Sequence, residues 1–195
     1  MIDMREKVVV CISGFAATGK STVGRRLAKN LGLRYISGGD ALKSIAVEMG
    51  YRPGGKDWWE REQGLKFLAK RGEDPSFDRR VDEKLMEMAL EGDVVIDSWV
   101  LPWLLDRERS YNIWLNASEE ARAERMARRS GLSRKKALEI LRQRDRESSE
   151  IYKKLYGIEL GRDFKPFHLV VDTTLLSEEQ VYRVVEGCVR RFFRI

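Results

Sequence analysis

The apolar positions of this chain alternate between short continuous runs and longer stretches with helical spacing. A continuous apolar run of four or five residues is typical of a strand that is covered on both faces. Between these runs, apolar residues recur three or four positions apart, which predicts amphipathic helices. Strands that alternate with helices predict a parallel sheet between two helical layers. The five strands are expected at residues 8–12, 33–36, 93–97, 111–115 and 167–173.

Two helical stretches interrupt this alternation. Three helices follow one another between the second and third strands, which predicts a helical insertion at about residues 40–90. Its helices are expected near residues 40–49, 58–70 and 75–91, the last with Asp74 as cap and Pro75 at the first helical position.

The second stretch is a helical hairpin before the last strand, which predicts a lid at about residues 130–156. Residues 142–150 contain no apolar side chain, so this part of the helix either spans solvent or faces a polar ligand. The remaining segments, at residues 1–39, 91–130 and 157–195, are expected to form the core of a single domain.

Composition suits one globular α/β domain, because the chain has 195 residues of which 43% are hydrophobic. No run approaches the ~20 apolar residues of a membrane span, and the charged first residues do not resemble a signal peptide. We therefore expect a cytoplasmic protein with two reduced cysteines. The net charge is +6, but the arginines concentrate between Arg122 and Arg146. This indicates local binding of small anions, and we expect a monomer with no membrane or nucleic-acid partner.

The most informative motif follows the first strand. Residues 14–21 read Gly-Phe-Ala-Ala-Thr-Gly-Lys-Ser, which fits the phosphate-loop pattern at every fixed position. Glycines let the backbone turn its N–H groups toward a polyphosphate at a helix N-terminus. The lysine reaches the β- and γ-phosphates, and the serine hydroxyl ligates Mg²⁺. The motif predicts ATP and Mg²⁺ at Gly14, Phe15, Ala16, Ala17, Thr18, Gly19, Lys20, Ser21 and Thr22.

Two further segments end near the predicted loop. Asp97 closes the third strand at its carboxyl end, where open α/β sheets place ligands. It is a candidate to hold Mg²⁺ with Ser21, or to orient an acceptor; a simple helix cap is the alternative. The turn that holds Ser37, Gly39 and Asp40 either contacts a ligand or only joins a strand to a helix that Asp40 caps.

Taken together, the phosphate loop, the insertion and the arginine-bearing hairpin resemble the nucleoside monophosphate kinase superfamily. Within it the chain resembles the archaeal-type cytidylate kinases over nearly its whole length. The resemblance implies a P-loop NTPase fold, a three-layer α/β/α sandwich, and ATP-dependent phosphorylation of CMP or dCMP. The segments that carry it are ISGFAATGKSTVGRRLAKNLG, YISGGDALKSIA, RGEDPSFDRRVD, VVIDSWVLPWL, NIWLNASEEARAERMARRSG, YKKLYGIEL and HLVVDTTLLSEEQV.

The chain departs from this family where acceptor-phosphate arginines are often found. Lys43 follows the Ser-Gly-Gly-Asp turn, Ser98 and Trp99 follow Asp97, and Ile151 precedes the Tyr-Lys-Lys run. We expect Lys43 to replace an arginine on the acceptor phosphate.

Phosphoryl transfer needs alignment and charge neutralisation, and arginine suits both because its planar fork binds phosphate bidentately. Arg122, Arg125 and Arg129 share one face of the hairpin's first helix. We expect the catalytic residues to be Lys20, Asp97, Arg125, Arg129, Arg142 and Arg144. The expected acceptor-binding residues are Ser37, Gly39, Asp40, Lys43, Asp82 and Asp97.

Asp40 and Asp82 are the candidates to accept a hydrogen bond from the cytosine amino group. Three alternative functions remain open from the sequence: a kinase for another nucleotide or a small hydroxyl acceptor, an RNA-linked P-loop ATPase, and a regulatory nucleotide switch.

Overall fold

A computed structural model describes residues 7–55 and 57–195 of the chain. Residues 1–6 of the predicted core and residue 56 of the predicted insertion lie outside the described residues. In the described ranges no helix combines the length and the apolar character needed to cross a membrane. The elements are β1 (Val9–Ser13), α1 (Lys20–Leu31), β2 (Arg34–Ser37), α2 (Gly38–Glu48), η1 (Trp58–Glu60), α3 (Glu62–Glu73), α4 (Ser76–Glu91), β3 (Val94–Asp97), α5 (Leu101–Leu104), η2 (Arg107–Arg109), β4 (Tyr111–Asn116), α6 (Glu119–Ser130), α7 (Arg134–Tyr156), β5 (Leu169–Asp172) and α8 (Glu178–Phe193).

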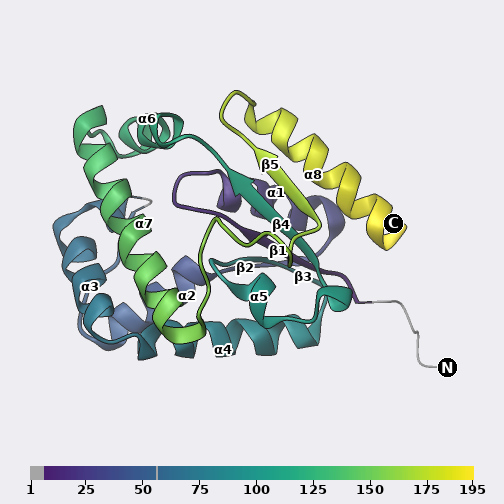
Figure 1. Cartoon of the computed structure of the whole chain (residues 1–195), viewed down its shortest axis with the longest axis horizontal. Coiled ribbons are helices and arrows are strands. Elements are labelled where there is room, and N and C mark those ends of the chain that lie inside the picture. The colour runs from purple at the N-terminus through teal and green to yellow at the C-terminus, as the bar shows by residue number, and fades with distance from the viewer. Residues whose placement is uncertain (1–6, 56) are drawn as a thin grey trace.

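The five strands form one sheet in the order β2-β3-β1-β4-β5, and every neighbouring pair is parallel (Figure 1). This confirms the predicted sheet. In the central strand, Cys11 pairs with Ile96 of β3 and with Asn112 of β4. After β1 the chain forms β2 and β3 on one side of this central strand, and it later forms β4 and β5 on the other side. The loop after β1 therefore opens where this strand order places a ligand crevice.

Alternate residues of β1 face different helical layers. Val10 and Ile12 belong to a core with α1 and α8, whereas Val9 and Cys11 belong to a core with α2, α4 and α5. Complete burial raises the pKa of the Cys11 thiol, so this cysteine is held in its neutral form. The two cores make the molecule the three-layer sandwich that the apolar pattern predicts.

The structure corrects two predictions for the insertion. The helix expected over residues 58–70 is broken after η1, because Arg61 has extended backbone angles (φ −94°, ψ 164°) before α3 begins. Pro75 stands at the cap position of α4 and not at its first helical position. Asp74 still accepts a hydrogen bond from the Ser76 N–H, at 3.0 Å.

The predicted lid, residues 130–156, consists of α7 and the turn before it at Gly131, where the backbone is left-handed (φ 66°). Helix α7 forms a hairpin with α6, which the prediction assigned to the core, and from here on the two helices together are called the lid. Ser118 and Ser133 cap the two helices, each accepting from a backbone N–H three residues later. In Figure 1, α7 runs beside α3 of the insertion, and the two helices are in contact. The polar middle of α7 therefore faces the insertion.

Candidate active site

The phosphate loop is shaped by two glycines. Gly14 has a φ of +144°, and a Cβ at this position would lie 2.2 Å from the backbone oxygen of Leu115, so a side chain does not fit. Gly19 has a φ of +101° and precedes α1 directly. Because glycine has no side chain to cap the helix, the first N–H groups of α1 stay available to an anion.

Lys20 lies folded across this loop. Its Nζ donates to the backbone oxygens of Gly14, at 2.8 Å, and Phe15, at 2.9 Å. Burial lowers the pKa of Lys20, and the nearby charge of Asp97 acts in the opposite direction. The ring centroid of Trp99 lies 5.4 Å from Nζ. The lysine charge is thus held inside the loop between a carboxylate and an aromatic wall.

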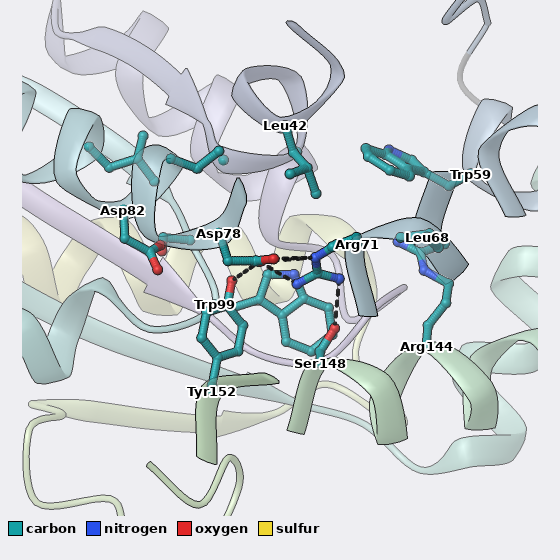
Figure 2. A pocket seen from close by; sticks show the side chains of 15 residues that line it. Leu42, Trp59, Leu68, Arg71, Asp78, Asp82, Trp99, Arg144, Ser148 and Tyr152 are labelled. Atoms are coloured by element: carbon teal, nitrogen blue, oxygen red, sulfur yellow. Dashed lines mark hydrogen bonds and ion pairs between the residues drawn. The ribbon is translucent and has the colours of Figure 1, made fainter. Parts of the chain in front are cut away.

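One cavity, here called the insertion cavity, lies between the sheet, the insertion and α7 (Figure 2). Its volume is about 60 Å³, which is room for a few water molecules only. Its lining includes the predicted residues Gly39, Asp82 and Arg144, and the aromatic rings of Trp59 and Trp99. In this arrangement the cavity is too small to hold a nucleotide.

A buried ion pair forms one wall of the insertion cavity. Arg71 of α3 donates to both carboxylate oxygens of Asp78, and its remaining guanidinium nitrogen donates to Ser148 of α7 at 3.3 Å. The Tyr152 hydroxyl donates to Asp78 at 3.0 Å (Figure 2). The Arg71 and Asp78 side chains are only 5% and 3% exposed. Sequence reasoning missed this network, because charged residues within helices look like solvent-facing positions.

Asp82 lies one helical turn after Asp78, at the same wall. Its Oδ2 accepts from the Tyr156 hydroxyl at 3.2 Å. Burial raises the pKa of Asp82 to about 8, and the charge of Asp78 adds to the rise. A buried carboxyl group with this pKa carries its proton over much of the neutral range.

A second cavity, here called the loop cavity, is lined by parts of the phosphate loop, α6 and the first turn of α8, and has a volume of about 420 Å³. Arg125 enters it from α6 and donates to the Thr173 hydroxyl at 2.9 Å and to the Thr173 carbonyl. Burial lowers the pKa of Arg125. The predicted residues that line this cavity are Ala17, Thr18, Gly19, Thr22, Arg125 and Arg129.

Of the four arginines predicted to be catalytic, two converge on one carboxylate. Arg129 of α6 and Arg144 of α7 each donate to Glu60 Oε1 at 2.8 Å. Arg142 points elsewhere: it is 59% exposed and pairs with Glu119 at 2.9 Å on the surface of the hairpin. The structure therefore brings Arg129 and Arg144 together at the insertion, but not Arg142.

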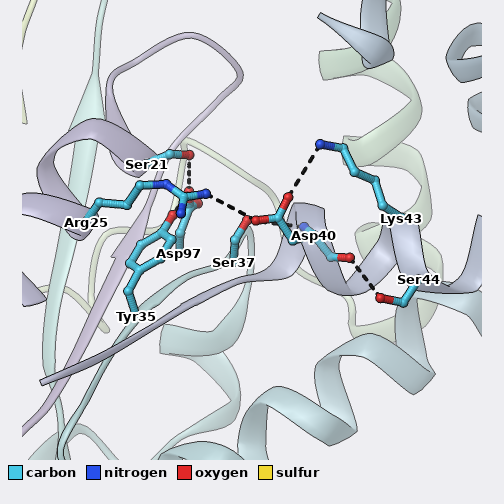
Figure 3. Close-up of polar contacts among 8 residues, drawn as sticks. All are labelled: Ser21, Arg25, Tyr35, Ser37, Asp40, Lys43, Ser44 and Asp97. Carbon is cyan, nitrogen blue, oxygen red and sulfur yellow. Dashed lines mark hydrogen bonds and ion pairs between the residues drawn. The ribbon is translucent and has the colours of Figure 1, made fainter. Parts of the chain in front are cut away.

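Ser21 and Asp97 meet beside the loop. The Ser21 hydroxyl donates to Asp97 Oδ2 at 2.5 Å, and the Tyr35 hydroxyl donates to the same oxygen at 3.2 Å (Figure 3). A hydroxyl and a carboxylate next to a phosphate loop are the hard oxygen ligands that Mg²⁺ prefers. These two side chains fit the predicted metal, and its binding remains a prediction.

The start of α2 differs from the expectation. Ser37 is the cap, because its hydroxyl accepts from the Asp40 N–H at 3.2 Å; the prediction that Asp40 caps this helix is wrong. The Asp40 side chain is 56% exposed and pairs with Arg25 at 3.2 Å and Lys43 at 3.4 Å (Figure 3). Asp40 thus lies outside the lining of the insertion cavity, whereas Asp82 is part of it.

Comparison with known proteins identifies the family. Residues 9–175 match the model of the cytidylate kinase-like family. The chain belongs to this family. A cytidylate kinase from Aeropyrum pernix is 38% identical over 186 residues, covering 92% of this chain and 98% of that protein. One from Ignicoccus hospitalis is 36% identical over 178 residues, covering 91% and 96%.

A shikimate kinase structure from Bacteroides thetaiotaomicron shares the fold alone, at 15% identity and a TM-score of 0.56 over 96% of this chain and 99% of that one. These findings confirm the resemblance, the P-loop NTPase fold and the enzyme class, a nucleoside monophosphate kinase.

In this cytidylate kinase-like protein, Arg122 is a second residue that sequence reasoning left out of the site. It is buried, and its guanidinium donates to Asp145 at 2.7 Å and to the Ala16 carbonyl of the phosphate loop at 3.3 Å. Arg122 therefore ties α6, α7 and the loop together. Its position on the same helical face as Arg125 and Arg129 is the signal that could have found it.

Trp99 and Lys43 occupy positions where the family resemblance predicts arginines. The Trp99 ring packs edge-on against Phe15 of the phosphate loop, with 6.0 Å between ring centroids. The Lys43 ammonium lies 5.8 Å from the ring centroid of Trp59. Trp99, beside Lys20, and Lys43, beside Trp59, thus stand at the positions where the resemblance predicts a guanidinium, and both rings line the insertion cavity.

Proposed function

We propose that this chain transfers the γ-phosphoryl group of ATP to CMP or dCMP, giving ADP and CDP or dCDP. The observation that carries the proposal is the pair of cavities, one lined by the phosphate loop and Arg129, the other by the insertion and Arg144. The match to cytidylate kinases over most of the chain supports the choice of acceptor.

On the donor side, ATP occupies the loop cavity. The backbone of residues 14–19 and the first turn of α1 receive the phosphates, and Lys20 turns from the loop carbonyls toward them. Arg125 and Thr22 lie along the same cavity toward the nucleoside. Ser21 and Asp97 would hold Mg²⁺, which when bound neutralises charge on the β- and γ-phosphates.

On the acceptor side, the monophosphate enters the insertion cavity. A phosphate oxygen is already nucleophilic, so the reaction needs alignment and charge but no general base. Arg144 lines this cavity and Arg129 the other, so the two guanidiniums flank the path of the transferred group. Trp59 and Trp99 exclude water from the same space.

For the base, Asp82 is the better of the two sequence candidates. It is 1% exposed and lines the insertion cavity, whereas Asp40 is exposed and already paired with Arg25 and Lys43. The Asp82 carboxyl accepts from the 4-amino group of cytosine, which uracil lacks. A buried partner left unpaired by the wrong base makes such discrimination strong.

A coupled ADP-release screen tests the proposal, with ATP, Mg²⁺ and each of CMP, dCMP, UMP, AMP and GMP. We expect the highest kcat/KM with CMP or dCMP. If UMP or AMP is best, the acceptor assignment fails while the kinase assignment stands. If no monophosphate is phosphorylated, the proposal is overturned; nucleic-acid affinity that falls steeply with salt would then favour the RNA-linked alternative.

A further inference from the structure

Glu60 is a buried acid that no sequence motif singles out. It ends η1, at the break that separates η1 from α3, and its side chain is only 1% exposed. Its Oε1 accepts from Arg129 and from Arg144, both at 2.8 Å, and its Oε2 lies 3.5 Å from the Ser130 hydroxyl. One carboxylate of the insertion thus holds groups from both helices of the lid.

The two arginines belong to different cavities. Arg144 lines the insertion cavity, and Arg129 lines the loop cavity. The Arg144 side chain is 15% exposed, and its guanidinium carbon lies 5.8 Å from the ring centroid of Trp59, the neighbour of Glu60. Glu60 is therefore the point where the insertion touches the arginines of both cavities.

The negative charge of Glu60 allows the two arginines to lie close together. Two guanidiniums that share one partner repel each other, and the carboxylate between them offsets that repulsion. A neutral amide would accept hydrogen bonds but would leave the charge of Arg144 buried without an ionic partner, which is strongly unfavourable. With the acid present, the insertion and the lid stabilise each other's positions.

We propose that Glu60 is a positioning residue that couples the two cavities, because it sets Arg129 and Arg144 in place only when the insertion and the lid are together. This inference rests on the proposed function. A ligand that favours this arrangement from one cavity then prepares the other, and thermodynamic linkage makes the effect reciprocal. Glu60 acts through the arginines and need not touch either substrate.

The test compares wild type with Glu60→Gln, using Glu119→Gln as the matched control. Glu119 also pairs with an arginine of α7, but on the exposed surface and within the lid. Calorimetry gives the Kd of a non-hydrolysable ATP analogue with and without saturating CMP. We expect CMP to tighten the analogue ~10-fold in wild type and in Glu119→Gln, and less than about twofold in Glu60→Gln.

Steady-state kinetics give a second readout. We expect kcat of Glu60→Gln to fall ~10-fold or more while KM for CMP changes much less, because the acid orders arginines that act on the transferred group. Glu60→Asp keeps the charge and should recover part of the coupling. If Glu60 only stabilised the fold, Glu60→Gln would change the coupling and kcat only together with the affinities for CMP alone and for the ATP analogue alone.

Failure of this inference and failure of the proposed function give different results. If wild type transfers phosphate to CMP and Glu60→Gln keeps the full coupling, or if wild type shows no coupling, the inference is overturned and the proposed function survives. If wild type phosphorylates no monophosphate, the proposed function itself fails. Should Glu60→Gln not fold, Arg129→Gln removes the half-exposed partner of the same pair, and unchanged coupling in that variant overturns the inference.

Discussion

Lys20 is the buried cation of the phosphate loop. It is almost fully buried, it is hydrogen-bonded to two loop carbonyls, and it lies between Asp97 and the Trp99 ring. Burial disfavours the charged form of Lys20, and the nearby charge of Asp97 acts in the opposite direction. The residue supplies charge at the loop while contributing little apolar area to the core.

Lys20→Ala should abolish transfer and leave the fold intact. The loop loses the charge that faces the β- and γ-phosphates, and we expect turnover to fall by at least ~10³-fold. Coupled ADP release measures the rate, and thermal unfolding checks the fold. Lys29→Ala, at an exposed position on the same helix, is the control and should behave as wild type. Near-wild-type turnover in Lys20→Ala would contradict the site assignment.

Asp82 should make stability depend on pH in the ligand-free protein. Its folded pKa of about 8 lies above the value of ~3.9 for an unfolded aspartate. Between these two values the folded state binds more protons, so the free energy of unfolding falls as pH rises. Above the folded pKa the destabilisation is complete.

The measurement is the Tm of wild type and Asp82→Asn at about pH 5 and about pH 9. Asparagine stays neutral and still accepts from Tyr156, so the variant should gain stability relative to wild type as pH rises. Asp40→Asn, at an exposed carboxylate, should show no such growing difference. A gap between Asp82→Asn and wild type that shrinks toward high pH would refute the burial argument.

At the scale of elements, α7 carries arginines on two different faces, one toward the insertion and one toward solvent. Residues two apart on a helix point in nearly opposite directions. Arg144 accordingly faces Glu60 and the insertion cavity, while Arg142 faces solvent and Glu119. The sequence presented both arginines as equal candidates, and only the packing of α7 against α3 separates them.

Arg144→Gln and Arg142→Gln should therefore differ sharply in turnover. We expect kcat to fall ~100-fold or more for Arg144→Gln, because a guanidinium at the insertion cavity is lost. Arg142→Gln breaks an exposed ion pair and should stay within about threefold of wild type. The same ADP-release assay measures both variants. Equal losses would mean that Arg142 reaches the transferred group after all.

The elements themselves were largely predictable, and the reasons are local. Strand runs such as residues 8–12 and caps such as Ser118, Ser133 and Ser177 depend on side chains within a few positions. The break at Arg61 was not predictable, because no glycine or proline marks it. Asp82 and Asp97 were predicted, but the buried acids Glu60 and Asp78 were missed for a related reason. Glu60 pairs with arginines 69 and 84 positions away, and helical periodicity carries no information about such contacts.

At the scale of the whole molecule, the insertion and the lid are held together by polar contacts across the insertion cavity. These link Glu60 with the lid arginines, Arg71 with Ser148, and Asp82 with Tyr156. The cavity that they enclose, about 60 Å³, is too small for a nucleotide. If the acceptor binds in this cavity, as proposed above, these contacts have to open and then re-form around the ligands.

Hydrogen exchange should localise this motion. With CMP and a non-hydrolysable ATP analogue together, we expect amide protection to rise in α2, α3 and α7 relative to the ligand-free protein, because the ligands bridge surfaces that open transiently without them. Gly50, Gly55 and Gly131 have positive φ near the ends of the moving segments, and they offer turns that absorb backbone rotation. The first turn of α8 lines the loop cavity, but the later part of this helix, around Val185 and Val189, packs on the sheet away from both cavities. The protection of this later part should stay the same and serves as the internal control. Each ligand alone should protect mainly the segments of its own cavity.

Uniform protection that includes the later part of α8 would indicate general stabilisation by binding, and unchanged exchange in α3 and α7 would show that the acceptor site does not close in this way.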